Sequence, residues 1–220
     1  MEEKEEPTMT LADAEPLGHR ERSKLKRRRH ILLSALRLFA EQGYSRTTIG
    51  DIAEASEVAP RTVSGYFPSK LDFVTEWPSS RSRRLIELYQ QHPGIAFVAF
   101  IDLYWHDARE NLDREEAALT RAMALANPGI AAMAEVAVAH RRAPDAPHLP
   151  QRADAGGDLL QQAGGAAVRA VDQVFFAGIA DGRMTDEAQA ALLGLVASIA
   201  AETGTGHGAL QPALSSPAAS

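Results

Sequence analysis

The chain has 220 residues, a net charge of -6 and no cysteine, and 45% of its residues are hydrophobic. A chain of this length buries a sizeable core, and we expect a small helical domain followed by a larger one. The absence of cysteine excludes disulfides, thiolate metal sites and cysteine nucleophiles. The negative net charge argues against indiscriminate binding to nucleic acid.

The charge is unevenly distributed along the chain. Residues 1–16 carry -5, whereas residues 17–77 contain eleven Lys or Arg against seven Asp or Glu, a net +4. Residues 1–19 are polar and lack the apolar core of a secretory signal, so we expect a disordered acidic tail. An alternative is that this tail competes with DNA for the basic residues that follow.

A helix is predicted from about residue 23 to residue 42, because apolar residues recur there at spacings of three and four. Gly43 suits a left-handed stop. Around the start of this helix lies a basic cluster made up of Arg20, Arg22, Lys24, Lys26, Arg27, Arg28 and Arg29. Such a cluster is typical of a phosphate-binding surface. The alternative is the solvated end of an ordinary three-helix bundle.

Two short helices joined by a turn are predicted over residues 47–67. Thr48 and Asp51 resemble a capping box at the start of the first helix. Pro60 suits the first position of the second helix, in which Val63 and Phe67 share an inward face. The outward face of this second helix consists of Arg61, Thr62, Gly65 and Tyr66.

These residues resemble the TetR family of bacterial transcriptional regulators. The resemblance covers about residues 23–74 and rests on the runs FAEQGY (39–44), TTI (47–49) and DIA (51–53), on Val58 and Thr62, and on YF (66–67) and SK (69–70). It implies that residues 60–67 enter the major groove of DNA. By the same resemblance, Thr48, Tyr66 and Lys70 contact phosphates and Arg61 and Thr62 approach base edges. The DNA-binding residues expected are Thr48, Arg61, Thr62, Ser64, Gly65, Tyr66 and Lys70.

Three positions depart from the family pattern. Glu57 stands where glycine is usual in the turn, Ala59 replaces the usual capping serine, and Ser64-Gly65 replaces a pair that is often aromatic or histidine. A non-glycine residue in a left-handed turn costs about 1 kcal/mol, and a lost cap costs about as much. Gly65 either loosens the helix or lets its backbone approach DNA closely.

Helices are predicted for most of the remaining chain. Ser69 caps a short helix that ends at Trp77, and Pro78 is either a hinge or, as we prefer, a helix boundary. Further helices are expected at 79–91, 95–110, 114–126, 130–142, 158–180 and 185–202. A mobile loop is predicted at 143–157 and a disordered tail at 204–220.

Aromatic residues in this second region are candidates for an effector pocket. The effector-binding residues proposed from the sequence are Tyr89, Trp105, His106 and Phe175. The alternative is that the aromatic side chains belong to the core and that the histidine lies on the surface. The last two helices, about 158–202, are apolar over wide arcs, so they form either a four-helix dimer interface, as the resemblance implies, or part of the monomer's core.

No HExxH, phosphate-loop or GxSxG motif is present, so we predict no catalytic residues, no metal site and no cofactor. The acidic residues Glu110, Asp113, Glu115 and Glu116 are interpreted as a solvated helix surface rather than as metal ligands.

The sequence thus predicts an all-α protein with a DNA-binding domain at 20–77 and an effector-binding and dimerisation domain at 78–203. The predicted function is a cytoplasmic, homodimeric and ligand-responsive repressor that binds a double-stranded DNA operator, with no association with membranes. The alternative is a helical ligand-binding or interaction protein whose helix-turn-helix has lost strong DNA binding.

Overall fold

A computed structural model describes residues 18–140 and 155–204. The fold is all-α, as predicted. Its helices are α1 (His19–Gln42), α2 (Ile49–Ala55), α3 (Pro60–Tyr66), α4 (Lys70–Gln91), α5 (Phe97–Asn111), α6 (Arg114–Ala126), α7 (Pro128–His140), α8 (Ala155–Ala180) and α9 (Asp186–Thr203). Within the described ranges, no helix combines the length and hydrophobicity needed to cross a membrane.

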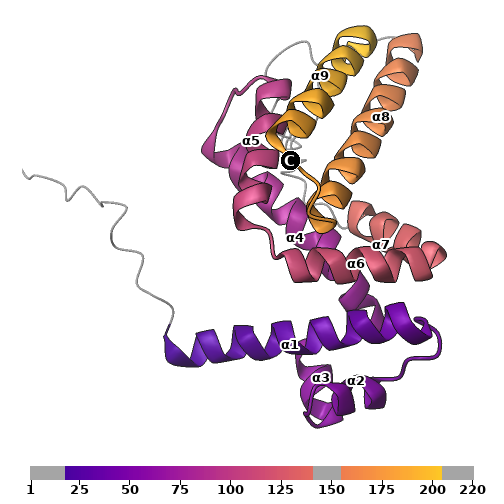
Figure 1. Ribbon diagram of the computed structural model, residues 1–220. Coiled ribbons are helices and arrows are strands. Elements are labelled where there is room, and N and C mark those ends of the chain that lie inside the picture. Colours follow the sequence, from indigo (N-terminus) through magenta and orange to yellow (C-terminus); the bar gives the residue numbers. More distant parts are fainter. Residues whose placement is uncertain (1–17, 141–154, 205–220) are drawn as a thin grey trace, which may run out of the picture.

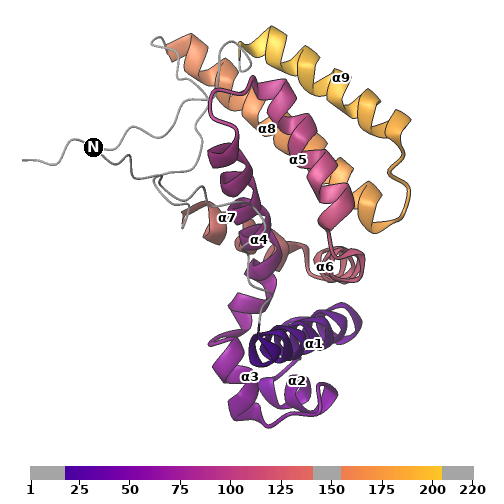
Figure 2. The same ribbon diagram turned by 90° about the vertical axis from the view of Figure 1, so that its left-hand side faces the viewer.

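The helices form a lower and an upper part (Figure 1). In the lower part, α1 lies across the molecule with α2 and α3 beneath it and α6 above it. The upper part contains α5, α8 and α9, and α4 connects the two parts. A view turned by 90° shows α1 nearly end-on below α6 (Figure 2). Because α6 contacts α1, α7 and α8, it lies at the junction between the two parts.

Each part has its own hydrophobic core. The lower core includes Ile31, Leu32, Leu36, Phe39, Ile52, Val63, Phe67, Phe73, Val74, Met123 and Ala134. The upper core includes Leu88, Tyr89, Phe97, Phe100, Ile101, Tyr104, Trp105, Val168, Val171, Phe175, Phe176, Ile179 and Val196. Met123 of α6 and Ala134 of α7 belong to the lower core. Residues of the predicted second region (78–203) therefore pack in the same core as residues of the predicted first region (20–77).

The predicted boundary at Pro78 is wrong, since α4 runs continuously from Lys70 to Gln91 with Pro78 buried inside it. An interior proline removes one backbone hydrogen bond and costs about 3 kcal/mol or more. Packing on both sides offsets this cost, because Phe73 lies in the lower core and Leu88 in the upper core. The helix thus links the two cores directly.

The predicted ends of α5, α6 and α9 agree with the structure to within two residues. The same holds for α7, which begins at Pro128, whose fixed φ suits a first helical position, whereas α1 begins at His19, earlier than expected. Residues 155–157, predicted as part of a loop, lie in α8. The remainder of that predicted loop, the N-terminal tail through residue 17 and the C-terminal tail from residue 205 fall outside the described residues.

Candidate nucleic-acid interface

The start of α2 is fixed by a capping box between Thr48 and Asp51. The backbone N–H of Thr48 donates to the Asp51 carboxylate (2.8 Å), and the backbone N–H of Asp51 donates to the Thr48 hydroxyl oxygen (3.1 Å). Hydrogen bonding of the Asp51 carboxylate to the backbone N–H and the side chain of Thr48 lowers the pKa of Asp51. The Thr48 side chain is exposed, so its hydroxyl can also approach a phosphate oxygen.

The turn between α2 and α3 is a Schellman motif. The backbone N–H of Val58 donates to the carbonyl of Ala53 (3.0 Å), and that of Glu57 donates to the carbonyl of Glu54 (3.1 Å). Glu57 occupies the left-handed position of this motif with φ +53°. The structure therefore confirms that Glu57 stands where a glycine would be free of strain.

The next helix, α3, buries one face and exposes the other. Pro60 is in its first turn, and Ala59 before it provides no side-chain cap. Val63 and Phe67 are buried in the lower core, as predicted. The residues on the other face are exposed (Arg61, Ser64 and Gly65) or half-buried (Thr62 and Tyr66). This arrangement leaves polar side chains and a bare backbone on a surface that can face a DNA groove.

Lys70 has a structural role besides the predicted phosphate contact. Its ammonium donates to the carbonyls of Tyr44 (2.5 Å) and Thr47 (2.7 Å), and it lies 4.3 Å from the centroid of the Tyr44 ring. A lysine ammonium has three hydrogens, so one remains for a phosphate. Lys70 therefore holds the loop before α2 in place.

The basic cluster of α1 has two different environments. Arg28 lies 4.4 Å over the Phe67 ring and forms an ion pair with Glu76 at 2.6 Å. Arg29 forms ion pairs with Asp113 and Glu115 at the start of α6. Both arginines belong to the basic cluster that was expected to bind phosphate, but they form ion pairs within the protein. Arg29 is itself exposed, as are Arg20, Arg22, Lys24, Lys26 and Arg27.

The acidic residues of this region are likewise more than a solvated surface. The Asp113 carboxylate accepts from the backbone N–H groups of Glu115 and Glu116 (both 3.1 Å) and caps α6. Hydrogen bonding to Arg29 lowers the pKa of Asp113. Burial raises the pKa of Glu116 to about 7, and the nearby charges of Asp113 and Glu76 add to this effect. Across the described residues, no group of acidic or histidine side chains is arranged to hold a metal ion.

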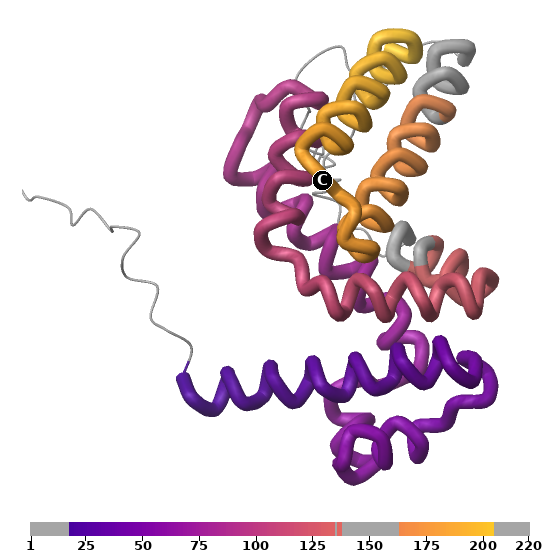
Figure 3. Tube along the Cα trace, in the orientation of Figure 1, coloured from indigo at the N-terminus to yellow at the C-terminus, as the bar shows by residue number. Residues whose placement is uncertain are grey.

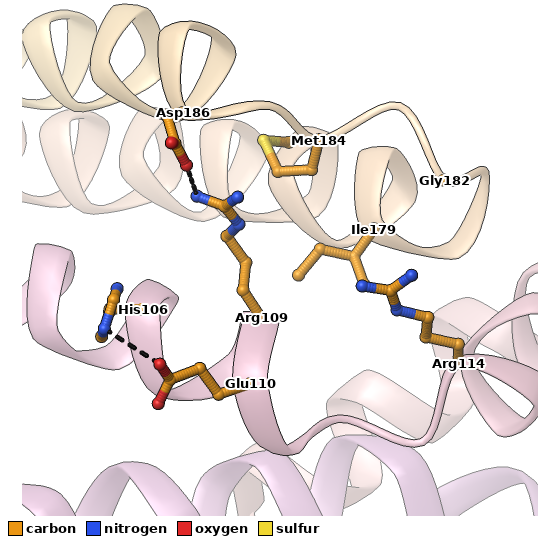
Figure 4. A pocket seen from close by; sticks show the side chains of 8 residues that line it. All are labelled: His106, Arg109, Glu110, Arg114, Ile179, Gly182, Met184 and Asp186. Carbon is orange, nitrogen blue, oxygen red and sulfur yellow. Dashed lines mark hydrogen bonds and ion pairs between the residues drawn. The ribbon is translucent and has the colours of Figure 1, made fainter.

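The four residues proposed for effector binding do not meet in one cavity. Tyr89, Trp105 and Phe175 are buried in the upper core, where the rings of Trp105 and Phe175 stack with centroids 4.5 Å apart. His106 is exposed and lines a separate polar cleft of about 310 Å³, where it lies 3.3 Å from Glu110 (Figure 4). In the same cleft, Arg109 points toward Asp186 (2.5 Å).

A larger and more apolar cavity lies between α4, α6, α7 and α8. It has a volume of about 450 Å³, and Trp77, Met123 and Phe176 contribute to its walls. Thr120 also lines it, and the Thr120 hydroxyl is buried with no hydrogen-bond partner among the described residues. Sequence reasoning missed this cavity because its walls come from four helices that are distant in the chain.

Arg81, which lines this cavity, belongs to a partly buried polar network that extends away from it. Arg81 forms an ion pair with Asp172, and its guanidinium carbon lies 3.8 Å from the centroid of the Phe176 ring. The indole N–H of Trp105 donates to Asp172 (2.9 Å), and Arg81 donates to the Tyr104 hydroxyl (3.3 Å). Burial raises the pKa of Tyr104 to about 12, so this hydroxyl stays protonated at neutral pH. Trp105 is therefore linked to the cavity wall only indirectly, through Asp172 and then Arg81.

Comparison with known proteins places the strongest similarity in the lower part. Residues 31–76 match the family model described as "Bacterial regulatory proteins, tetR family". The HTH-type transcriptional regulator AcrR of Shigella flexneri is 45% identical over 56 residues, which is 25% of this chain and 26% of that protein. A protein of Escherichia coli K12 named "Probable acrEF/envCD operon repressor" is 36% identical over 69 residues, 31% of this chain and 30% of that protein.

The chain thus spans between a quarter and a third of the length of these curated relatives. Among solved structures, a TetR family transcription regulator from Marinobacter aquaeolei VT8 aligns over 87% of this chain and 100% of its own, with 17% identity and a TM-score of 0.46.

Proposed function

Residues 31–76 form a helix-turn-helix domain of the TetR family, and on that premise we propose that this chain is a ligand-responsive transcriptional repressor that binds operator DNA as a homodimer. Regulators of this family are not enzymes. The observation that carries the proposal is that α3, whose outer face is exposed at Arg61, Ser64 and Gly65, lines a groove at Thr62 together with the basic residues Lys26 and Arg27 of α1. We propose that the protein acts in the cytoplasm, where bacterial operator DNA lies.

The repressor assignment is supported by the printed name of the Escherichia coli relative, an operon repressor. In this role the protein binds its operator in one state and leaves it in another. A ligand drives this change only if it binds the two states with different affinities, and a coupling of roughly 1 to 3 kcal/mol gives a 5- to 150-fold response.

The cavity between α4, α6, α7 and α8 is the effector site that we propose. Its volume suits a small organic molecule, and its walls are mainly apolar with few polar groups. The unpaired hydroxyl of Thr120 supplies a hydrogen-bonding position for that molecule. Because Met123 belongs both to the cavity wall and to the lower core, a bound molecule would press on residues that support the DNA-binding helices.

The dimer contact that we propose uses the outer faces of α8 and α9. Residues 188–201 of α9 contain no charged side chain. Part of this surface turns away from the monomer's core, since Leu195 of α9 is 49% exposed and Val174 of α8 is 57% exposed. An uncharged apolar helix face of this kind is typical of a homodimer interface.

Selection of bound fragments from random duplexes at a fixed salt concentration tests DNA binding. We expect a palindromic motif with half-sites about one helical turn apart, because a symmetric dimer presents two copies of α3. Arg61→Ala should relax the base preference, whereas Tyr66→Ala should weaken binding to all sequences alike. If no duplex is preferred over bulk competitor DNA, the protein is instead a helical binding protein whose helix-turn-helix has lost this activity.

Sedimentation of the full chain tests the dimer. Leu195→Lys should yield monomers, because it places a charge in the proposed apolar contact. Leu25→Lys is the matched control, since Leu25 is 52% exposed and lies on α1, in the lower part of the molecule. Equal sedimentation of both variants and the wild type would refute the proposed interface.

A further inference from the structure

We propose that the groove between α1 and the turn joining α2 to α3 binds a backbone phosphate of DNA, and that Arg20 extends this contact to the DNA flanking the half-site. This inference rests on the proposed function and adds a second contact region to the one formed by α3. It divides the basic cluster of α1 into residues that face DNA and residues that face the rest of the protein.

The groove has a volume of about 660 Å³ and joins α1 to the recognition helix. The residues of α1 that line it are Ser23, Lys26, Arg27 and His30, and the facing wall includes Glu57 in the turn and Thr62 in α3. Two permanent positive charges therefore converge on a space that opens beside Thr62, with Glu57 as the opposing charge. Lysine and arginine side chains in such a position are suited to a phosphate oxygen.

The direction in which Arg20 points follows from the helical repeat. Residues seven apart lie on nearly the same face of an α-helix, so Arg20, Arg27 and Ser34 form one row. The Ser34 hydroxyl lies 3.5 Å from the carbonyl of Ala55 at the end of α2. Arg27 lines the groove beside the turn that follows α2. The row therefore runs along the α2–α3 side of α1, and Arg20 is its outermost member.

A second row points the other way. Arg22 and Arg29 are also seven residues apart, and Arg29 forms ion pairs with Asp113 and Glu115 of α6. Arg22 thus lies on the side of α1 that faces the upper part of the molecule. Arg20 and Arg22 carry the same charge and are both exposed, but they belong to opposite rows.

The first turns of α1 extend beyond the rest of the lower part. Figure 3 shows this end of α1 projecting past α2 and α3. Every residue from 18 to 27 is exposed. Seven residues of helix span about 10 Å, which corresponds to roughly three base pairs at 3.4 Å each. On a duplex that lies along α1, Arg20 would reach about three base pairs farther than Arg27.

The test measures affinity of the full-length protein for its selected operator over a range of salt concentrations. Each lost phosphate contact reduces the slope of log K against log salt by about 0.9. Arg20→Ala and Arg27→Ala should each show this reduction together with a several-fold loss of affinity at 0.1 M salt. Arg22→Ala, the matched control, should leave the slope unchanged. Circular dichroism confirms that each variant is folded.

Operator length separates the two contacts. On a duplex trimmed to the outer edges of the half-sites, the loss caused by Arg20→Ala should disappear, whereas the loss caused by Arg27→Ala should remain. Equal losses for Arg20→Ala and Arg22→Ala would overturn the proposal, because they would indicate a general effect of net charge. Wild-type affinity in the Arg27→Ala variant would also overturn it while leaving the proposed function intact. Failure of the wild type to bind any duplex would refute both.

Discussion

Arg29 of α1 and Asp113 at the start of α6 form a two-hydrogen-bond ion pair although they are 84 residues apart in the sequence. Arg29 also donates to Glu115 at 2.9 Å. Asp113 caps α6 at the same time, so one carboxylate both starts this helix and ties it to α1. This ion pair joins α6 to α1 by polar contacts, and Met123 of α6 adds an apolar contact with the lower core. Together they connect the DNA-binding helices to the helices that line the cavity.

Substitutions at Asp113 should separate capping from ion pairing. Asp113→Asn retains a good capping residue but removes the charge, and we expect it to lower the free energy of unfolding by about 1 kcal/mol. Asp113→Ala removes both and should cost about 2 kcal/mol. Urea denaturation at neutral pH measures both values. Equal losses in the two variants would show that the cap contributes nothing beyond the charge, and wild-type stability in Asp113→Asn would show that the charge contributes nothing.

The raised pKa of Glu116 should be visible in the pH dependence of the free energy of unfolding. Its folded-state pKa of about 7 exceeds the ordinary value of 4.5, so the folded protein retains a proton that the unfolded chain has released. Between these two values, this group makes the free energy of unfolding fall as pH rises. Glu116→Gln should remove this fall and stabilise the protein at pH 7.5 by about 1 to 2 kcal/mol, at roughly 1.4 kcal/mol per pKa unit with allowance for residual exposure. A parallel pH profile in wild type and variant would contradict the assignment.

Glu57 combines backbone strain with an unfavourable charge. Glu57→Gly should raise the free energy of unfolding by about 0.5 to 1 kcal/mol, because glycine adopts a positive φ without strain. Glu57→Ala keeps the strain and should not stabilise the fold. Both variants should bind DNA more tightly at low salt, since each removes the negative charge that faces Lys26 and Arg27 in the groove. Thermal unfolding and operator titration of the two variants separate strain from charge.

We expect that Gly65 allows the backbone of α3 to approach DNA closely. A Cβ added there would meet nothing within 4 Å, so Gly65→Ala causes no clash within the protein. Alanine should stabilise the helix by about 0.5 to 1 kcal/mol. We expect operator affinity to fall nevertheless, because the added methyl group would keep the backbone of α3 away from the duplex. Unchanged affinity together with higher stability would show that Gly65 only loosens the helix.

Local sequence patterns predicted the elements of the DNA-binding part. The capping box of Thr48, the proline at the start of α3 and the apolar spacing of Val63 and Phe67 each depend on residues a few positions apart. Such short-range signals fix where helices begin and which face is buried. The unusual turn at Glu57 was equally visible, because the family resemblance indicates glycine there.

Long-range packing overrode local rules elsewhere. Pro78 is a helix breaker by local propensity, yet α4 continues through it because its two halves are anchored in different cores. Arg29 belongs to a basic cluster in the sequence, but in the structure it pairs with Asp113, which lies 84 residues away at the start of α6. Tyr89, Trp105 and Phe175, which the sequence suggested for effector binding, lie in the upper core because helices distant in the chain pack around them.

The sequence by itself determined that this is an all-α chain with a basic helix-turn-helix near its N-terminus, because helical periodicity, caps and turn residues act over a few positions. Only the tertiary structure decided which arginines of α1 face the α2–α3 turn, where Thr120 and its neighbours enclose a cavity, and how α6 joins the two cores. These features depend on contacts between segments distant in the chain, and the energy of such contacts is set by where whole helices pack rather than by their own residue patterns.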